Sequence, residues 1–439
     1  MTALSQLVFT LICSLLAVNA WAHPFKLNTE LSHPKLVKDQ KINAYVKVAL
    51  TGLELDRDRP PLNVALVIDR SGSMSGQRIY HAQQAAEMAI KMLKPNDIIS
   101  LVSYNNEAQV LLPATKVGDG SMALKLIKQL HATGGTALYA GTQLGGEEVI
   151  KFIEKDNVNR VILLSDGIAN VGPSSPSDLA KLGMKLAGKG IAVSTIGLGL
   201  GYNEDLMARL ADSSDGNHSF VEHAHQLANV MSLELNDASA VVAQDVKVNM
   251  EFAKGIRPVR ALGREAQFDG QSVSSSIKQL ITGTERFVLI EVEINKDVIE
   301  SRIELVKVAV DYRSNEGQTK QAQQVAKAEV AKDRSDMDKH VQAAVMESVV
   351  ELIAREQQAM AIKLKDEGKD DKAADLMTRN NAYLKSNAQR YKSKKLKVME
   401  ERAQADQEIM KKRGKGSDWS RTRKSMRKRA YSSKAQMAF

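Results

Sequence analysis

Residues 62–236 alternate short apolar runs with segments of helical periodicity, and this rhythm constrains the fold more than any other feature of the chain. The run at residues 64–69 is apolar up to its final aspartate, as expected of a strand covered on both faces. Residues 77–93 have apolar side chains at helical spacing, and Pro95 ends that pattern before the next apolar run, residues 98–104. The alternation predicts an α/β fold, with a doubly wound and mostly parallel sheet covered by helices on both faces.

Two aspartates stand at the ends of predicted strands in this segment. Asp69 closes the first strand, and Asp166 follows the strand predicted at residues 161–165. A further strand, residues 191–197, comes after a helical segment near residues 179–187. In open parallel sheets, ligands bind outside the carboxyl ends of the strands. The two aspartates therefore mark the expected position of a binding site.

Three short motifs supply a set of five oxygen-bearing side chains. They are Val-Ile-Asp-Arg-Ser-Gly-Ser-Met, Thr-Gly-Gly-Thr-Ala-Leu and Val-Ile-Leu-Leu-Ser-Asp-Gly, which contain Asp69, Ser71 and Ser73, then Thr136, then Asp166. Two carboxylates and three hydroxyls, without His or Cys, suit a hard divalent cation. Converging carboxylates also repel one another unless a cation lies between them. Mg²⁺ keeps octahedral geometry and retains waters, so an acidic side chain of another molecule could complete its shell.

These motifs resemble the metal-ion-dependent adhesion site (MIDAS) of von Willebrand factor type A (VWA) domains, over about residues 61–236, and the chain resembles a secreted bacterial protein of that kind. The resemblance implies that Asp69, Ser71 and Ser73 hold the metal from one loop. Thr136 and Asp166 then contribute from two other loops, directly or through water. It also implies Mg²⁺, with Ca²⁺ or Mn²⁺ as alternatives, and a protein ligand that offers Asp or Glu to the metal.

Other chemistries fit the sequence less well. Met74, not a serine, is central in Gly-Ser-Met-Ser-Gly, so the nucleophile motif Gly-x-Ser-x-Gly is absent. Zinc is disfavoured because no His-Glu-x-x-His occurs in the sequence. The cluster of His218, His223 and His225 is more simply explained as loop histidines, with a metal role as the alternative. We expect a protein that is not an enzyme and has no catalytic residues.

The N-terminus has the features of a secretory signal peptide, residues 1–22. Residues 7–18 are apolar, and Ala20 and Ala22 place small side chains before His23. A membrane anchor is the alternative, although the apolar run is shorter than the roughly twenty residues that a spanning helix needs. The expected location is therefore the periplasm or cell envelope, or outside the cell.

Composition shifts divide the rest of the chain. Period-two alternation at residues 42–50 predicts a half-buried strand, and Val- and Ile-rich runs after residue 240 predict more strands. The sequence permits the early strand to join the later ones in one sheet, which would make the VWA domain an insertion, or to remain separate from them. The predicted units are the signal peptide at 1–22, an N-terminal β segment at 23–60, the VWA domain at 61–236, a β-rich domain at 237–330, a helical hairpin at 331–410 and a basic tail at 411–439.

The net charge of +9 is concentrated in the basic tail, residues 411–439. This segment contains eleven Lys and Arg residues and one acidic residue, Asp418, so the rest of the chain is close to neutral. The tail could be a solvated end or could bind an anionic surface such as lipid headgroups or an envelope polymer. No nucleic acid is expected, because export separates the chain from it and Trp419 and Tyr431 are the tail's only aromatics before its last residue. Two functions follow: metal-dependent protein binding in adhesion or assembly, or an envelope scaffold acting through the helices and tail.

Overall fold

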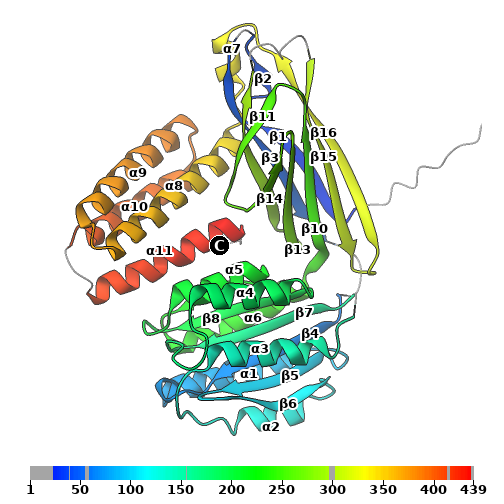
Figure 1. Ribbon diagram of the computed structural model, residues 1–439, viewed down its shortest axis with the longest axis vertical. Helices are drawn as coiled ribbons and strands as arrows, with labels where there is room; N and C mark the ends of the chain where they lie inside the picture. Colours follow the sequence, from blue (N-terminus) through cyan, green and yellow to red (C-terminus); the bar gives the residue numbers. More distant parts are fainter. Residues whose placement is uncertain are drawn as a thin grey trace, which may run out of the picture.

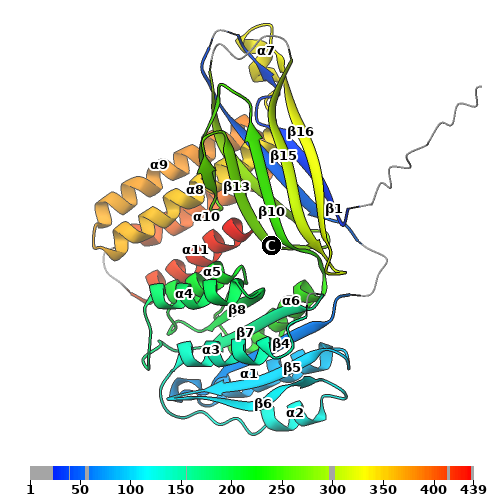
Figure 2. The same ribbon diagram turned by 45° about the vertical axis from the view of Figure 1, so that its right-hand side comes forward.

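The computed structural model describes residues 23–38, 40–54, 59–154, 156–295, 302–412 and 416–436. The predicted signal peptide, residues 1–22, lies outside the described residues. An α/β domain lies at one end of the molecule, a β-sandwich at the other, and a group of helices along one side (Figures 1 and 2). Among the described residues, no helix has the length and apolar character needed to cross a membrane.

The α/β domain is built on a six-stranded sheet with the order β6-β5-β4-β7-β8-β9. All its neighbouring strands are parallel except β5 and β6. The strands are β4 (Leu62–Asp69), β5 (Ile98–Tyr104), β6 (Ala108–Lys116), β7 (Val158–Ser165), β8 (Ile191–Leu198) and β9 (His218–Val221). Every residue of β4, β7 and β8 is buried, which explains their mostly apolar sequences.

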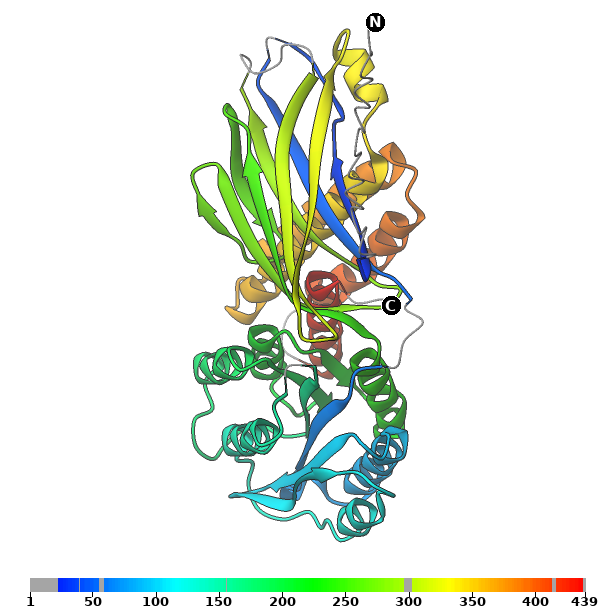
Figure 3. The ribbon, with the colours of Figure 1, turned by 90° about the vertical axis from the view of Figure 1, so that its right-hand side faces the viewer.

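Helices cover both faces of this sheet, which confirms the predicted doubly wound α/β fold (Figure 3). One face carries α1 (Gln77–Met92), α2 (Ser121–Ile127) and α6 (Leu227–Ser239). The other carries α3 (Leu138–Ile150), α4 (Pro176–Ala187) and α5 (Glu204–Ser214). Helix α3 lies very close to the sheet, because a Cβ added at Gly145 would lie 2.4 Å from Cγ2 of Val67.

The second domain is a β-sandwich with one core between two sheets. The first sheet has the order β1 (Phe25–Leu31), β3 (Ile42–Gly52), β14 (Glu285–Ile294), β11 (Ile256–Leu262). The second has the order β12 (Gln267–Asp269), β13 (Ser272–Ile281), β10 (Val241–Phe252), β15 (Arg302–Ser314), β16 (Thr319–Val330), β2 (Lys35–Leu36). Because β3 pairs with β14, the N-terminal segment is part of this sandwich, and the α/β domain is inserted between β3 and β10.

The helical region has three consecutive long helices where a hairpin of two was expected. They are α8 (Ala343–Asp366), α9 (Asp370–Arg390) and α10 (Lys394–Lys411), preceded by the short α7 (Arg334–Lys339). The predicted second helix is interrupted because Lys392 has a positive φ of 49° and Ser393 caps α10, its side chain accepting a hydrogen bond from the Leu396 amide. Helix α8 packs on the outer face of the first sheet, where Val349 meets Leu289.

Within the predicted basic tail, α11 (Ser417–Ala435) is a folded helix and not a solvated segment. It packs against α5, β9 and α8, with Trp419 and Met426 in the core of the helical region. Its charges are largely paired within the molecule: Arg423 contacts the carboxylates of Glu204, Asp205 and Asp366. Burial of an apolar stripe and neutralisation by acidic neighbours explain why so basic a segment folds here.

Candidate metal centre

Asp69 and Asp166 lie at the carboxyl ends of adjacent parallel strands. Asp69 is the last residue of β4, and Asp166 directly follows β7. The register pairs Ile68 with Leu164, so the two aspartates leave the sheet at the same edge. Strand β4 pairs with β7 on one side and with β5, the next strand in the chain, on the other. The aspartates thus stand where the strand order reverses, the usual place for a ligand in such sheets.

The loop after β4 links the two carboxylates through the Ser71 amide and the hydroxyls of Ser71 and Ser73. The Ser71 amide donates to Asp69 Oδ1 at 2.8 Å, and the Ser71 and Ser73 hydroxyls lie 3.0 Å apart. Ser73 Oγ then donates to Asp166 Oδ1 at 2.7 Å. A short 3₁₀ turn, η1 (Gly72–Met74), gives the loop the curvature that brings both hydroxyls to one side. Four of the five predicted residues are therefore directly connected.

Thr136 reaches the same place from a second loop. Gly134 has a φ of 80°, which favours glycine, and its carbonyl accepts from the Gly72 amide at 2.9 Å. A Cβ added at Gly167 would lie 3.1 Å from Thr136 Oγ1 and 3.4 Å from Ser73 Oγ. All five predicted side chains thus meet around one point, supplied by three loops.

Several supporting residues had not been singled out from the sequence. Asn170 Oδ1 accepts from the Thr136 amide at 2.8 Å, and Asn106 Oδ1 accepts from the Gly135 amide at 2.7 Å. Ser165 Oγ donates to Asp69 Oδ2 at 2.7 Å. Of these, only Ser165 carried a signal, because it belongs to the Ser-Asp-Gly motif. The two asparagines lie in loops whose proximity to Thr136 arises from the fold.

Burial makes the site unfavourable for uncompensated negative charge. Asp69 is fully buried, and burial raises its pKa from 3.8 to about 6. Hydrogen bonds from Ser165 and Ser71 oppose that rise, while the charge of Asp166 adds to it. A cation between the two carboxylates would reverse this balance, because it would favour the ionised form of both.

Arg78, in the first turn of α1, also touches the site. Its Nη1 atom donates to Asp166 Oδ2 at 2.5 Å and to the Ser73 carbonyl at 3.1 Å. The Arg78 side chain is 45% exposed, whereas that of Asp166 is fully buried. The Asp166 carboxylate therefore accepts one hydrogen bond from a hydroxyl and one from a guanidinium group. No signal in the sequence pointed to Arg78.

The histidine cluster does not form a second centre. His218 is buried in β9, where its Nδ1 lies 2.9 Å from Thr195 Oγ1, and burial lowers its pKa to about 3. His223 and His225 stack on one another. Across the described part of the chain, no group of three or more His, Cys, Asp or Glu side chains is placed to hold a metal. The oxygen donors around Asp69 and Asp166 fit a hard cation that uses carboxylates, hydroxyls and water together.

Comparison with known proteins identifies the α/β domain. The family profile of the von Willebrand factor type A domain matches residues 63–234. The chain is 31% identical over 231 residues to protein YfbK of Escherichia coli strain K12, which covers 52% of this chain and 40% of that protein. It is 28% identical over 279 residues to protein sll0103 of Synechocystis, covering 60% and 66%. The chain thus spans less than two thirds of either relative.

A solved structure shows that the likeness extends beyond the α/β domain. A von Willebrand factor type A protein from Catenulispora acidiphila superposes with a TM-score of 0.67 at 18% identity. The match covers 84% of this chain and 88% of that chain. Because the family profile ends at residue 234, the shared fold also includes parts of the sandwich and helical region.

Proposed function

We propose a metal-dependent protein-binding function for this chain, whose residues 63–234 form a von Willebrand factor type A domain. The domain binds a divalent cation through Asp69, Ser71, Ser73, Thr136 and Asp166. Mg²⁺ is the proposed ion, with Ca²⁺ and Mn²⁺ as alternatives of the same oxygen-preferring class. The function is adhesion or assembly and not catalysis, and the proposed location is the periplasm or cell envelope.

The observation that carries the proposal is the approach of two buried carboxylates at one sheet edge. Asp69 and Asp166 are joined through Ser71 and Ser73 over three short contacts. Hydroxyls and carboxylates on loops with fixed backbone hydrogen bonds can hold a cation without rearranging the sheet. An Mg²⁺ ion held in this way keeps waters in its shell.

A partner protein would bind by replacing one of those waters with a carboxylate oxygen. The interaction would then be charge-assisted and sensitive to geometry, because Mg²⁺ demands near-octahedral coordination. The partner is accordingly proposed to present an exposed Asp or Glu. Its recognition would depend on the metal even though most of the contact surface is protein.

The first test is calorimetric titration of Mg²⁺ into the chain without residues 1–22. Asp69→Asn should abolish binding, while Asp371→Asn, an exposed residue in the first turn of α9, should leave it unchanged. Capture of an envelope extract on the same proteins, with Mg²⁺ or with EDTA, then tests partner binding. A partner retained only by the wild type and the Asp371 variant in Mg²⁺ supports the proposal. A partner that is retained equally in EDTA and by the Asp69→Asn variant would contradict the proposal.

The alternative function, an envelope scaffold or surface anchor that acts through the helical region and the basic tail, has less support. Arg421, Arg423, Lys424, Arg427 and Arg429 of α11 all pair with acidic side chains of the same molecule. These cations are therefore engaged internally, which weakens the case for an anionic surface as the partner. The metal centre is the stronger basis for function.

A further inference from the structure

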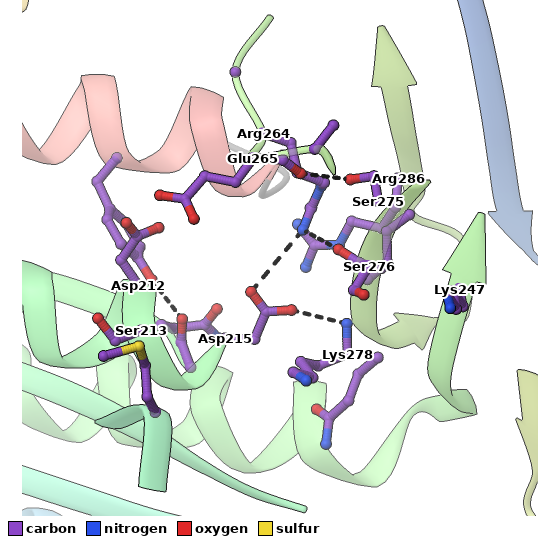
Figure 4. Close-up of a pocket in the computed structure, with 18 of the residues that line it drawn as sticks. Asp212, Ser213, Asp215, Lys247, Arg264, Glu265, Ser275, Ser276, Lys278 and Arg286 are labelled. Atoms are coloured by element: carbon purple, nitrogen blue, oxygen red, sulfur yellow. Dashed lines mark hydrogen bonds and ion pairs between the residues drawn. The ribbon is translucent and has the colours of Figure 1, made fainter. Parts of the chain in front are cut away.

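A cavity of about 790 Å³ lies between the α/β domain and the β-sandwich, away from the metal centre. One wall comes from α5 and the residues after it, including Asp212 and Asp215. The other comes from the sandwich, with Arg264 between β11 and β12, Lys278 on β13 and Arg286 on β14 (Figure 4). Its volume falls in the range of about 300–1,000 Å³ typical of small-molecule sites.

The lining of the cavity is positively charged. Six basic residues line it against three acidic ones, so the local charge favours an anion. The basic residues are Arg160, Arg209, Lys247, Arg264, Lys278 and Arg286, and the acidic residues are Asp212, Asp215 and Glu265. Three consecutive serines, residues 274–276, add polar groups on the sandwich side.

Arg286 is the most unusual residue of this cavity. Arg286 is only 7% exposed, yet its Nη1 atom has no hydrogen-bond partner among the residues that the structure describes. A buried guanidinium donor without a partner destabilises the folded state, since its interactions with water are not replaced. Burial, and next the charge of Arg264, lower the Arg286 pKa to about 10. The charges of Asp215 and Asp237 oppose this shift, but two neighbouring guanidinium groups at a cavity wall still favour an anion beside them.

Arg264 also has a hydrogen-bond donor that is not used within the described part of the chain. Its Nη1 donates to the Ser276 carbonyl at 3.1 Å, but its Nε has no partner. Its ion pair with Asp215 is long, 3.9 Å, and the other Asp215 oxygen already accepts from the Lys278 amide at 2.8 Å. Asp215 therefore compensates the charge of Arg264 only weakly.

We infer that this cavity is a binding site for a small phosphate-bearing ligand, with Arg264 and Arg286 as its main anchors. The planar guanidinium group matches the geometry of a phosphate and binds two of its oxygens at once. A phosphate dianion offsets two adjacent positive charges, whereas a single carboxylate offsets one. The cavity exceeds the size of phosphate alone, which leaves room for the rest of a phosphorylated molecule. Because both domains supply walls, the ligand would also hold them together.

The inference is tested with inorganic phosphate, pyrophosphate and citrate as probes, titrated calorimetrically into the chain without residues 1–22. EDTA is present throughout, so that metal binding at Asp69 does not contribute. The variants are Arg286→Gln and Arg264→Gln, with Arg379→Gln as control, because that arginine is 69% exposed on α9 and pairs with Asp375 of the same helix. Sodium chloride at matched ionic strength controls for general screening.

We expect saturable binding of phosphate or pyrophosphate, weakened about tenfold or more in Arg286→Gln and Arg264→Gln but not in Arg379→Gln. Without ligand, Arg286→Gln should melt at or above the wild-type temperature, because it removes an unpaired buried charge. This second readout separates a ligand-binding arginine from a structural one, whose loss would lower the melting temperature. Absence of saturable phosphate and pyrophosphate binding, unchanged binding in Arg286→Gln, or tighter binding of citrate than of either phosphate probe would each overturn the inference.

Discussion

Ser73 donates a hydrogen bond of 2.7 Å to Asp166, a residue 93 positions later in the chain. Through Ser71 and the Asp69 carboxylate, this contact connects the ends of β4 and β7. The geometry of each carboxylate thus depends on the other and on the loop between β4 and α1. Changes to any of these groups should alter the metal site as a unit.

Stability in the absence of metal should depend on pH through Asp69. Its pKa is about 6 in the folded protein, above its ordinary 3.8, so the folded protein holds the proton more tightly than the unfolded chain. The metal-free protein should therefore lose stability as pH rises from about 4 to about 6, by at most about 3 kcal/mol, and the loss should persist above pH 6. Thermal unfolding in EDTA across this range measures the effect.

Asp69→Asn supplies the comparison that isolates this residue, because other carboxylates titrate in the same range. The melting temperature of the variant relative to the wild type should rise between pH 4 and pH 7 in EDTA. Mg²⁺ should stabilise the wild type more at pH 7 than at pH 5, since protons compete for the carboxylate. If the melting temperatures of the two proteins changed with pH in the same way, ionisation of Asp69 would not be the cause of the loss of stability.

Arg78→Gln should tighten Mg²⁺ binding. The Arg78 guanidinium lies 2.5 Å from Asp166 Oδ2, where it competes for a metal ligand and repels the incoming cation. Removing its charge should raise the affinity by a factor on the order of ten at low salt, and less at high salt. Calorimetry at two salt concentrations, with Arg379→Gln as control, measures this. Weaker binding in Arg78→Gln would mean that the arginine instead positions Asp166 for the metal.

Asn170→Ala should weaken Mg²⁺ binding without removing any metal ligand. Asn170 Oδ1 holds the Thr136 amide at 2.8 Å, so its loss frees the loop that presents the Thr136 hydroxyl. A loss of about tenfold in affinity is expected, as for other residues that orient metal ligands. Asn170→Asp keeps the acceptor and should retain most of the affinity. Equal affinities for wild type and Asn170→Ala would show that Thr136 needs no such support.

Arg423→Gln should destabilise the docking of α11. Arg423 contacts carboxylates of both α5 and α8, and its loss would leave these three carboxylates with less positive charge beside them. The cost should be about 1–3 kcal/mol, whereas Arg421→Gln should have a much smaller effect, because the Arg421 side chain is 51% exposed and its ion pair is screened by solvent. Melting temperature and the rate of tryptic cleavage within α11 are the measurements. Similar effects of the two substitutions would argue against a specific clamp.

Much of the fold could be predicted from local pattern. The apolar run that became β4 ends in Asp69, and the next strands repeat the pattern, so a parallel sheet with aspartates at its edge followed directly. The strand at residues 42–50 was also recognised, although its pairing with β14 was left open. The predicted helical hairpin at 331–410 lacked the boundary between α9 and α10, because the break at Lys392 and Ser393 depends on one positive φ and one cap.

Composition misled at the C-terminus for a physical reason. Residues 411–439 are strongly basic, and by themselves such residues favour a solvated segment. The sequence does not show that Glu204, Asp205 and Asp366 converge on Arg423. Paired charges and a buried apolar stripe, with Trp419 and Met426, turn this segment into a docked helix.

The sequence by itself determined the α/β architecture and the five candidate metal ligands, because periodicity and short motifs are local properties written in consecutive residues. Only the tertiary structure decided what surrounds them: Arg78 and Asn170 at the metal centre, the docking of α11, and the buried Arg286, whose Nη1 lacks a hydrogen-bond partner in the described part of the chain. These depend on contacts between residues far apart in the chain. Their energies arise from burial and charge pairing, which exist only once the segments are packed together.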